Sequence, residues 1–147
     1  MTISWLLATV HLLALGIGFG SCWMRGRALA KTQTEAHLPS VFFADNMYGI
    51  ATLLWIATGL WRAFGTTDKG SEYYLNSQTF WIKMGLFGLV FLLELYPMIS
   101  LIKWRMALKK EKSITLGIAK TLAMLSYAEL FVMAAMILAA TALARGL

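Results

Sequence analysis

The chain has 147 residues, of which 59% are hydrophobic and only 14% are charged, and its formal net charge is +6. A soluble globular domain normally has about a quarter of its residues charged, so the composition excludes that class. The basic residues are confined to short segments between long apolar runs. This placement is typical of membrane topology rather than of a nucleic-acid surface, and we expect no nucleic-acid partner.

Four apolar runs occupy roughly residues 3–24, 41–64, 79–102 and 118–143. Each run exceeds the ~20 residues that a helix needs to cross the hydrocarbon core of a bilayer. The pattern predicts an all-α fold, an integral membrane four-helix bundle with a single transmembrane domain over residues 1–147. We expect the first run to be retained rather than cleaved, because no basic residue precedes it and Arg25 and Arg27 follow it.

The distribution of Lys and Arg predicts the orientation. Nine basic residues lie in segments 25–40 and 103–120, against three on the opposite side, Arg62, Lys69 and Arg145. Because cytoplasmic segments carry the excess of Lys and Arg, both termini and the 65–78 loop are expected to be extracytoplasmic. The predicted location is the bacterial inner (plasma) membrane, as a multi-pass protein.

Ionisable residues inside the apolar runs are the main functional signal. Each costs at least ~2.5–3.5 kcal/mol at membrane depth and normally faces the bundle interior. The topology places His11, Lys83 and Arg62 in the outer half of the bilayer. It places three acids between the middle and the cytoplasmic half: Asp45, Glu94 and Glu129. The acids are then too deep to neutralise the cations directly, although membrane charges also often serve only to tie helices together.

The neighbours of His11 on its helical face are small residues. Its other members are Ser4, Ala8, Ala14, Gly18, Cys22 and Arg25. Small residues allow close helix packing in membranes, which is one interpretation. The other is that they leave room beside His11 for a flat ligand.

Haem b or another porphyrin is the leading cofactor hypothesis. A neutral imidazole is a suitable axial iron ligand, and Arg62 and Lys83 in the same layer are suited to hold propionates. Met84 is a candidate sixth ligand, unless that position stays open. His37 is not, because it lies about 20 Å lower by helix rise. Lys83 is also a candidate catalytic group, and the three acids are candidates for a proton relay or a structural role.

Other functions remain open from the residues alone. The nine methionines include soft ligands for copper, but they are scattered, so core filling explains them better. Glu94 and Glu129 are candidate relay groups for a proton or ion transporter, which would require an oligomer. A non-enzymatic scaffold or assembly subunit is a further alternative, with a membrane protein partner or a second copy of the chain.

Several motifs resemble those of one family of bacterial membrane proteins classed as a domain of unknown function. The residues that carry the resemblance are His11, Ala44-Asp45-x-x-Tyr48-Gly49, Gly59-x-x-Arg62, Lys69-Gly70-x-x-Tyr73-Tyr74-x-Asn76-x-x-x-Phe80-Trp81-x-Lys83 and Tyr96-Pro97. The resemblance extends from about residue 8 to about residue 105. The resemblance implies a membrane location and supplies no established activity.

The chain is also distantly similar to the haem-binding, oxygen-independent protoporphyrinogen oxidases, whose relatives include copper-resistance inner-membrane proteins. The similarity rests on size, on about four spans, on His11 in the first span and on Lys83 at the start of the third. It implies that His11 is a haem ligand and Lys83 an active-site group. The chain departs from these enzymes in lacking their second-helix histidine pattern and their proline-arginine segment after the first helix.

Overall fold

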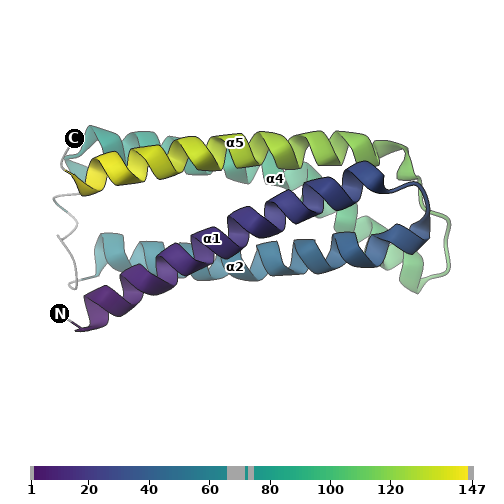
Figure 1. Ribbon diagram of the computed structural model, residues 1–147, viewed down its shortest axis with the longest axis horizontal. Coiled ribbons are helices and arrows are strands. Elements are labelled where there is room, and N and C mark those ends of the chain that lie inside the picture. Colours follow the sequence, from purple (N-terminus) through teal and green to yellow (C-terminus); the bar gives the residue numbers. More distant parts are fainter. Residues whose placement is uncertain (1, 66–71, 73–74, 146–147) are drawn as a thin grey trace.

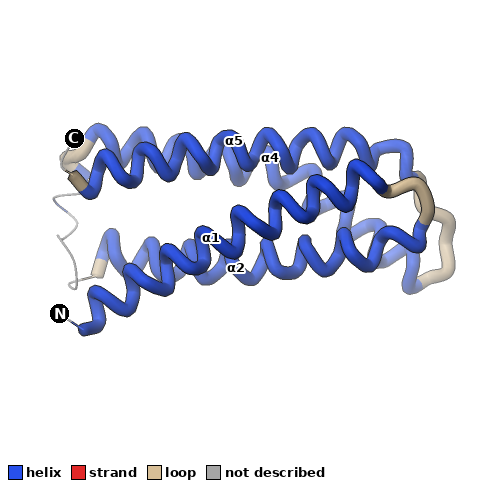
Figure 2. Tube along the Cα trace, viewed as in Figure 1, coloured by secondary structure: helices blue, strands red, loops and turns tan. Residues whose placement is uncertain are grey.

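Four long helices account for most of the protein in the computed structural model, which describes residues 2–65, 72 and 75–145 (Figures 1 and 2). The helices are α1 (Thr2–Lys31), α2 (Leu38–Phe64), α4 (Gln78–Lys109) and α5 (Ala119–Ala144). Single 3-10 turns, η1 (Glu35–His37) and η2 (Leu116–Ile118), precede α2 and α5. No strand occurs in the described ranges, and all four helices are long and apolar enough to span a bilayer. The prediction of an all-α fold is confirmed, and the four long helices are candidate membrane spans by their length and composition.

Two helices continue well beyond the predicted spans. α1 runs on to Lys31 and α4 to Lys109. Their last turns are rich in Ala, Leu, Met, Lys and Arg, which are the strongest helix formers. The predicted spans ended at residues 24 and 102 because basic residues follow these positions. The helices nevertheless continue through the basic residues. Pro97 lies buried within α4, which continues through it.

The helices pass each other in a splayed arrangement. The start of α1 and the end of α5 lie at one end of the bundle, here called the terminal end, and the α1–α2 and α4–α5 connections lie at the other, the loop end (Figure 1). α1 starts beside α2 and crosses to α5 at the loop end. Close backbone contacts join α1 to α2, α4 to α5 and α1 to α5, whereas α2 and α4 make at most marginal backbone contact in the described ranges.

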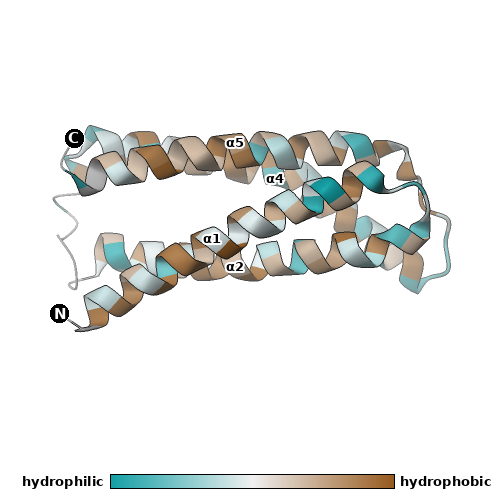
Figure 3. Ribbon diagram, in the orientation of Figure 1, coloured by the Kyte–Doolittle hydropathy of each residue, from teal (hydrophilic) through white to brown (hydrophobic). Residues whose placement is uncertain are grey.

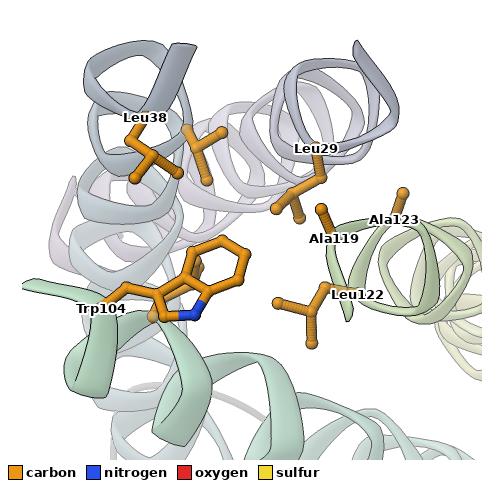
Figure 4. Close-up of a cluster of buried hydrophobic side chains, with 8 residues drawn as sticks. Leu29, Leu38, Trp104, Ala119, Leu122 and Ala123 are labelled. Atoms are coloured by element: carbon orange, nitrogen blue, oxygen red, sulfur yellow. The ribbon is translucent and has the colours of Figure 1, made fainter. Parts of the chain in front are cut away.

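Two layers of buried apolar side chains divide the bundle along its length. The loop-end layer draws on all four helices, and Figure 4 shows Leu29, Leu38 and Trp104 converging with the first turns of α5. Its members are Leu29, Leu38, Val41, Leu101, Trp104, Ala119, Leu122 and Ala123. The middle layer, nearer the terminal end, consists of Cys22, Tyr48, Val90, Leu130, Met133 and Met136.

The outer surface of the bundle is strongly apolar. Phe131 is 80% exposed and Leu138 71% exposed, and large hydrophobic side chains are exposed on every long helix. Hydrophilic residues gather toward the loop end, while the middle of the helices is mostly hydrophobic (Figure 3). Exposed apolar area of this extent requires a covering partner, and a bilayer supplies one.

Candidate functional site

A cavity of about 600 Å³ lies between the α1–α2 pair and the α4–α5 pair, toward the terminal end. This volume is within the range of small-molecule and cofactor sites. Its wall is mostly aliphatic and aromatic and is supplied by all four long helices. The three residues expected to share one layer, His11, Arg62 and Lys83, all line it, as does Met84.

A hydrogen bond determines which nitrogen of the His11 ring carries the proton in the neutral imidazole. Nδ1 of His11 lies 2.9 Å from Oγ1 of Thr58, and the hydroxyl of Thr58 lies 2.7 Å from the carbonyl oxygen of Leu54. Because that hydroxyl has one proton and donates it to the carbonyl, it accepts the bond from Nδ1–H of His11. In the neutral imidazole Nε2 then keeps its lone pair, as in a histidine prepared to ligate a metal.

Trp55 and Gly59 hold the imidazole in place. The Trp55 ring stacks on His11 with centroids 5.4 Å apart and planes 21° apart. A Cβ atom at Gly59 would lie 3.1 Å from Cε1 of His11, so only glycine lets the ring pack there without displacement. The indole N–H of Trp55 is itself buried without a hydrogen-bond partner in the described structure. The indole nitrogen is thus enclosed by protein, and Nε2 of His11 is the acceptor that this part of the wall offers in the neutral ring.

Lys83 brings a positive charge to this cavity. Its side chain is half-buried, and no carboxylate in the described ranges pairs with it. Arg62 adds a second basic group to the same wall. A cation in an apolar cavity is stabilised by an anion, so the wall favours a ligand that is apolar over most of its surface and acidic at one end.

The three acids of the apolar runs gather elsewhere, around Arg25 of α1; Arg25 and Glu129 are fully buried, whereas Asp45 and Glu94 are partly exposed. Nη1 of Arg25 lies 3.0 Å from Oδ1 of Asp45 and 2.9 Å from Oε1 of Glu94. Nη2 lies 2.6 Å from Oε2 of Glu94 and 3.0 Å from Oε2 of Glu129. Nε donates to the hydroxyl of Ser126 at 3.1 Å. All five guanidinium N–H groups have acceptors, and these come from α2, α4 and α5.

Arg105 of α4 extends this cluster. Its Nη2 lies 2.8 Å from Oδ2 of Asp45 and 3.2 Å from the carbonyl oxygen of Phe42, so it joins α4 to α2 where their backbones do not pack closely. We call Arg25, Arg105, Asp45, Glu94 and Glu129 the arginine cluster. It lies between the loop-end layer and the middle layer, as the positions of Leu29 and Cys22 on either side of Arg25 show.

The expected positions of Arg25 and Arg105 need correction. Both were counted as charges of cytoplasmic loops, but both lie within helices and form ion pairs with the acids. The signal for Arg25 was present, because Cys22, Arg25 and Leu29 continue the 3–4-residue spacing of the His11 face. Nothing in the sequence pattern singled out Thr58 or Trp55. Their contact with His11 depends on how α1 and α2 are aligned.

The cavity and the arginine cluster are separate. Along α1, His11 and Arg25 are 14 residues apart, about 21 Å at 1.5 Å per residue, and the middle layer lies between them. His37 is exposed at the loop end, far from His11. Lys69, Tyr73 and Tyr74, which contribute to one of the motifs, lie outside the described residues. Over the described residues, no group of three or more His, Cys, Asp or Glu side chains is placed to hold a metal ion.

Comparison with known proteins gives a family and no activity. No curated protein and no solved structure matches the chain. Residues 3–147 match the model of a family described as a predicted membrane protein, DUF2214. Because this match covers nearly the whole chain, the protein belongs to the DUF2214 family of predicted membrane proteins.

Proposed function

We propose that the protein binds an apolar ligand with acidic groups in the terminal-end cavity, and that this ligand is haem b or a related porphyrin. The observation that carries the proposal is the composition of the cavity wall. His11 offers a lone pair, Lys83 offers a positive charge without a carboxylate partner in the described ranges, and the rest is largely apolar. Haem presents complementary groups, an iron, two carboxylates and a flat apolar ring.

The residues of the cavity fit haem in three respects. His11 would bind the iron through Nε2, with Thr58 as the partner that fixes the ring. Lys83 and Arg62 would hold the propionates. Met84 lines the same wall and is the candidate for a second iron ligand. When bound, haem supplies one-electron redox chemistry, and the polypeptide orients it and excludes water. We assign Lys83 this binding role and no catalytic step.

We further propose an orientation of the protein in the membrane, which determines the side of the bilayer on which the cavity lies. With both termini extracytoplasmic in a bacterial inner membrane, the cavity belongs to the outer half of the bilayer. Seven basic residues near the loop end take no part in the arginine cluster and support this orientation. They are Arg27, Lys31, Lys103, Lys109, Lys110, Lys112 and Lys120.

Titration of the detergent-purified protein with haemin tests the proposal. We expect a shifted Soret band that saturates at one haemin per chain. We expect His11→Ala to lose the shift, and Lys83→Met to weaken binding at least tenfold. Lys103→Met removes an exposed cation from the same helix and serves as the matched control, with unchanged affinity.

Equal, weak absorption changes in wild type and His11→Ala would overturn the haem proposal. Normal assembly of His11→Ala into a complex with one stoichiometric membrane partner would then favour the scaffold function.

A further inference from the structure

The arginine cluster contains one more acid than it has guanidinium groups. Asp45, Glu94 and Glu129 face Arg25 and Arg105, so the cluster has a net charge of −1 if every group is ionised. The neighbouring titratable side chains on the packed helices are Cys22 and Tyr48, and neither supplies a positive charge. No other cation forms an ion pair with the cluster in the part of the chain that the structure describes.

The oxygen atoms of the three acids are not equivalent. Both oxygens of Asp45 and both of Glu94 receive guanidinium N–H groups. Oε2 of Glu129 receives one from Arg25 and also faces the thiol of Cys22 at 3.6 Å. Oε1 of Glu129 is buried and has no hydrogen-bond partner in the described structure. Five of the six oxygens are thus satisfied by arginine, and the sixth belongs to Glu129.

Within the cluster, Glu129 and Arg25 are shielded from the surface, whereas Asp45, Glu94 and Arg105 are partly exposed. Glu129 is 0% exposed, and apolar layers lie on both sides of the cluster along the bundle. An unpaired charge in such surroundings is strongly destabilising, whereas a neutral carboxylic acid is far less costly to bury. One bound proton removes the surplus without disturbing any of the arginine contacts.

We propose that the arginine cluster binds one proton on Oε1 of Glu129, so that this residue is a carboxylic acid and the cluster is electrically neutral in the folded protein. The proton comes from water, and only one O–H bond forms. The proposal does not depend on the cavity or its ligand. Deprotonation at alkaline pH leaves one uncompensated negative charge inside the bundle, and the fold loses stability.

Infrared spectroscopy of the purified protein tests the proton directly. We expect a protonated-carboxyl band at neutral pH that shifts in heavy water and shifts again when all Glu carboxyl groups carry ¹³C. Glu129→Gln removes the band, and Glu111→Gln, at an exposed position, leaves it in place. Absence of the band from the wild-type protein overturns the proposal whether or not the variant folds, and so does its persistence in a folded Glu129→Gln variant.

Thermal unfolding provides an independent readout. Glu129→Gln replaces a neutral acid by a neutral amide, so its unfolding midpoint at neutral pH stays close to that of the wild type. At alkaline pH the midpoint of the wild type falls more than that of the variant. Glu94→Gln removes the bidentate ion pair with Arg25 and lowers the unfolding midpoint at every pH. Equal losses for Glu94→Gln and Glu129→Gln at neutral pH contradict the proposal.

Discussion

Arg25 links all four long helices through its side chain. Its side chain leaves α1 and reaches acceptors on α2, α4 and α5 with every N–H group in use. The guanidinium also lies over the ring of Tyr48, 4.7 Å from its centroid. The guanidinium group of arginine has five N–H donors in one plane and can therefore serve all of these acceptors. The ammonium group of lysine has only three N–H donors and cannot.

We therefore predict that Arg25→Lys destabilises the protein although it keeps the charge. Breaking a buried ion pair costs about 3–5 kcal/mol, and Lys leaves at least two acceptors unfilled. Arg27→Lys, two residues further along α1 and exposed, is the matched control with no measurable change. The readout is the thermal unfolding midpoint in detergent, and equal midpoints for the two variants would contradict the role given to Arg25.

Gly59 tests the position of His11. Gly59→Ala places a methyl group 3.1 Å from Cε1 of His11, so the ring must shift by a few tenths of an ångström, against its contacts with Thr58 and Trp55. Gly49→Ala, also on α2, meets nothing within 4 Å. Both gain about 1 kcal/mol of helix propensity, so their difference in stability isolates the clash, which typically costs about 1–3 kcal/mol. We expect Gly59→Ala to be the less stable variant and to bind haemin more weakly.

At the scale of the helices, α1 organises the bundle by contacting α2 and α5 in turn. The close approach to α5 occurs at Gly26, where a Cβ atom would lie 3.0 Å from the ring of Tyr127. Beside α2, Gly18 faces Ala51. The interpretation of the small residues of α1 as helix-packing positions therefore holds at Gly18. Beside His11, the same helix lines the cavity.

We predict that Gly26→Ala weakens the α1–α5 contact. The added methyl group pushes against the Tyr127 ring, which also makes an edge contact with Trp23. Gly20→Ala in the same helix meets nothing within 4 Å and gains the same helix propensity. Gly20→Ala should be neutral or stabilising in thermal unfolding. A Gly26→Ala variant of equal stability would show that α5 does not constrain α1 at this point.

The sequence was sufficient to predict the helices, because four apolar runs of this length have few other interpretations. It also grouped His11, Lys83 and Arg62 correctly at one end, since helix rise alone sets their depth. It did not predict the partner of Glu129, because Arg25 lay beyond the apolar run and was assigned to a loop. The contact of His11 with Thr58 depends on helix rotation, which apolar residues on nearly every face of α1 leave undetermined.

At the scale of the molecule, the bundle is layered from one end to the other. The loop-end apolar layer is followed by the arginine cluster, the middle apolar layer and the cavity. Ion pairs tie α2 and α4 together in the loop-end half through Arg105 and Asp45, while the cavity separates them in the other half. The ion pairs of the arginine cluster, which link the helices, are thus separated by an apolar layer from Lys83, whose charge is available to a ligand in the cavity.

The orientation of these layers is testable with single cysteines. We predict that Asn76→Cys, exposed at the terminal end, is labelled in intact cells by a membrane-impermeant maleimide. Thr115→Cys, exposed at the loop end, should react only after lysis. Cys22 is fully buried and stays in place. The reverse pattern would invert the topology and move the cavity to the cytoplasmic half.

The most direct test of a haem-binding cavity is the ultraviolet–visible spectrum of the protein purified from cells supplied with haem, recorded oxidised and then reduced. The account predicts a Soret band that shifts on reduction, with sharpened bands at longer wavelength, and its loss in His11→Ala. A wild-type protein that is folded, purified under haem excess and free of Soret absorption would contradict it.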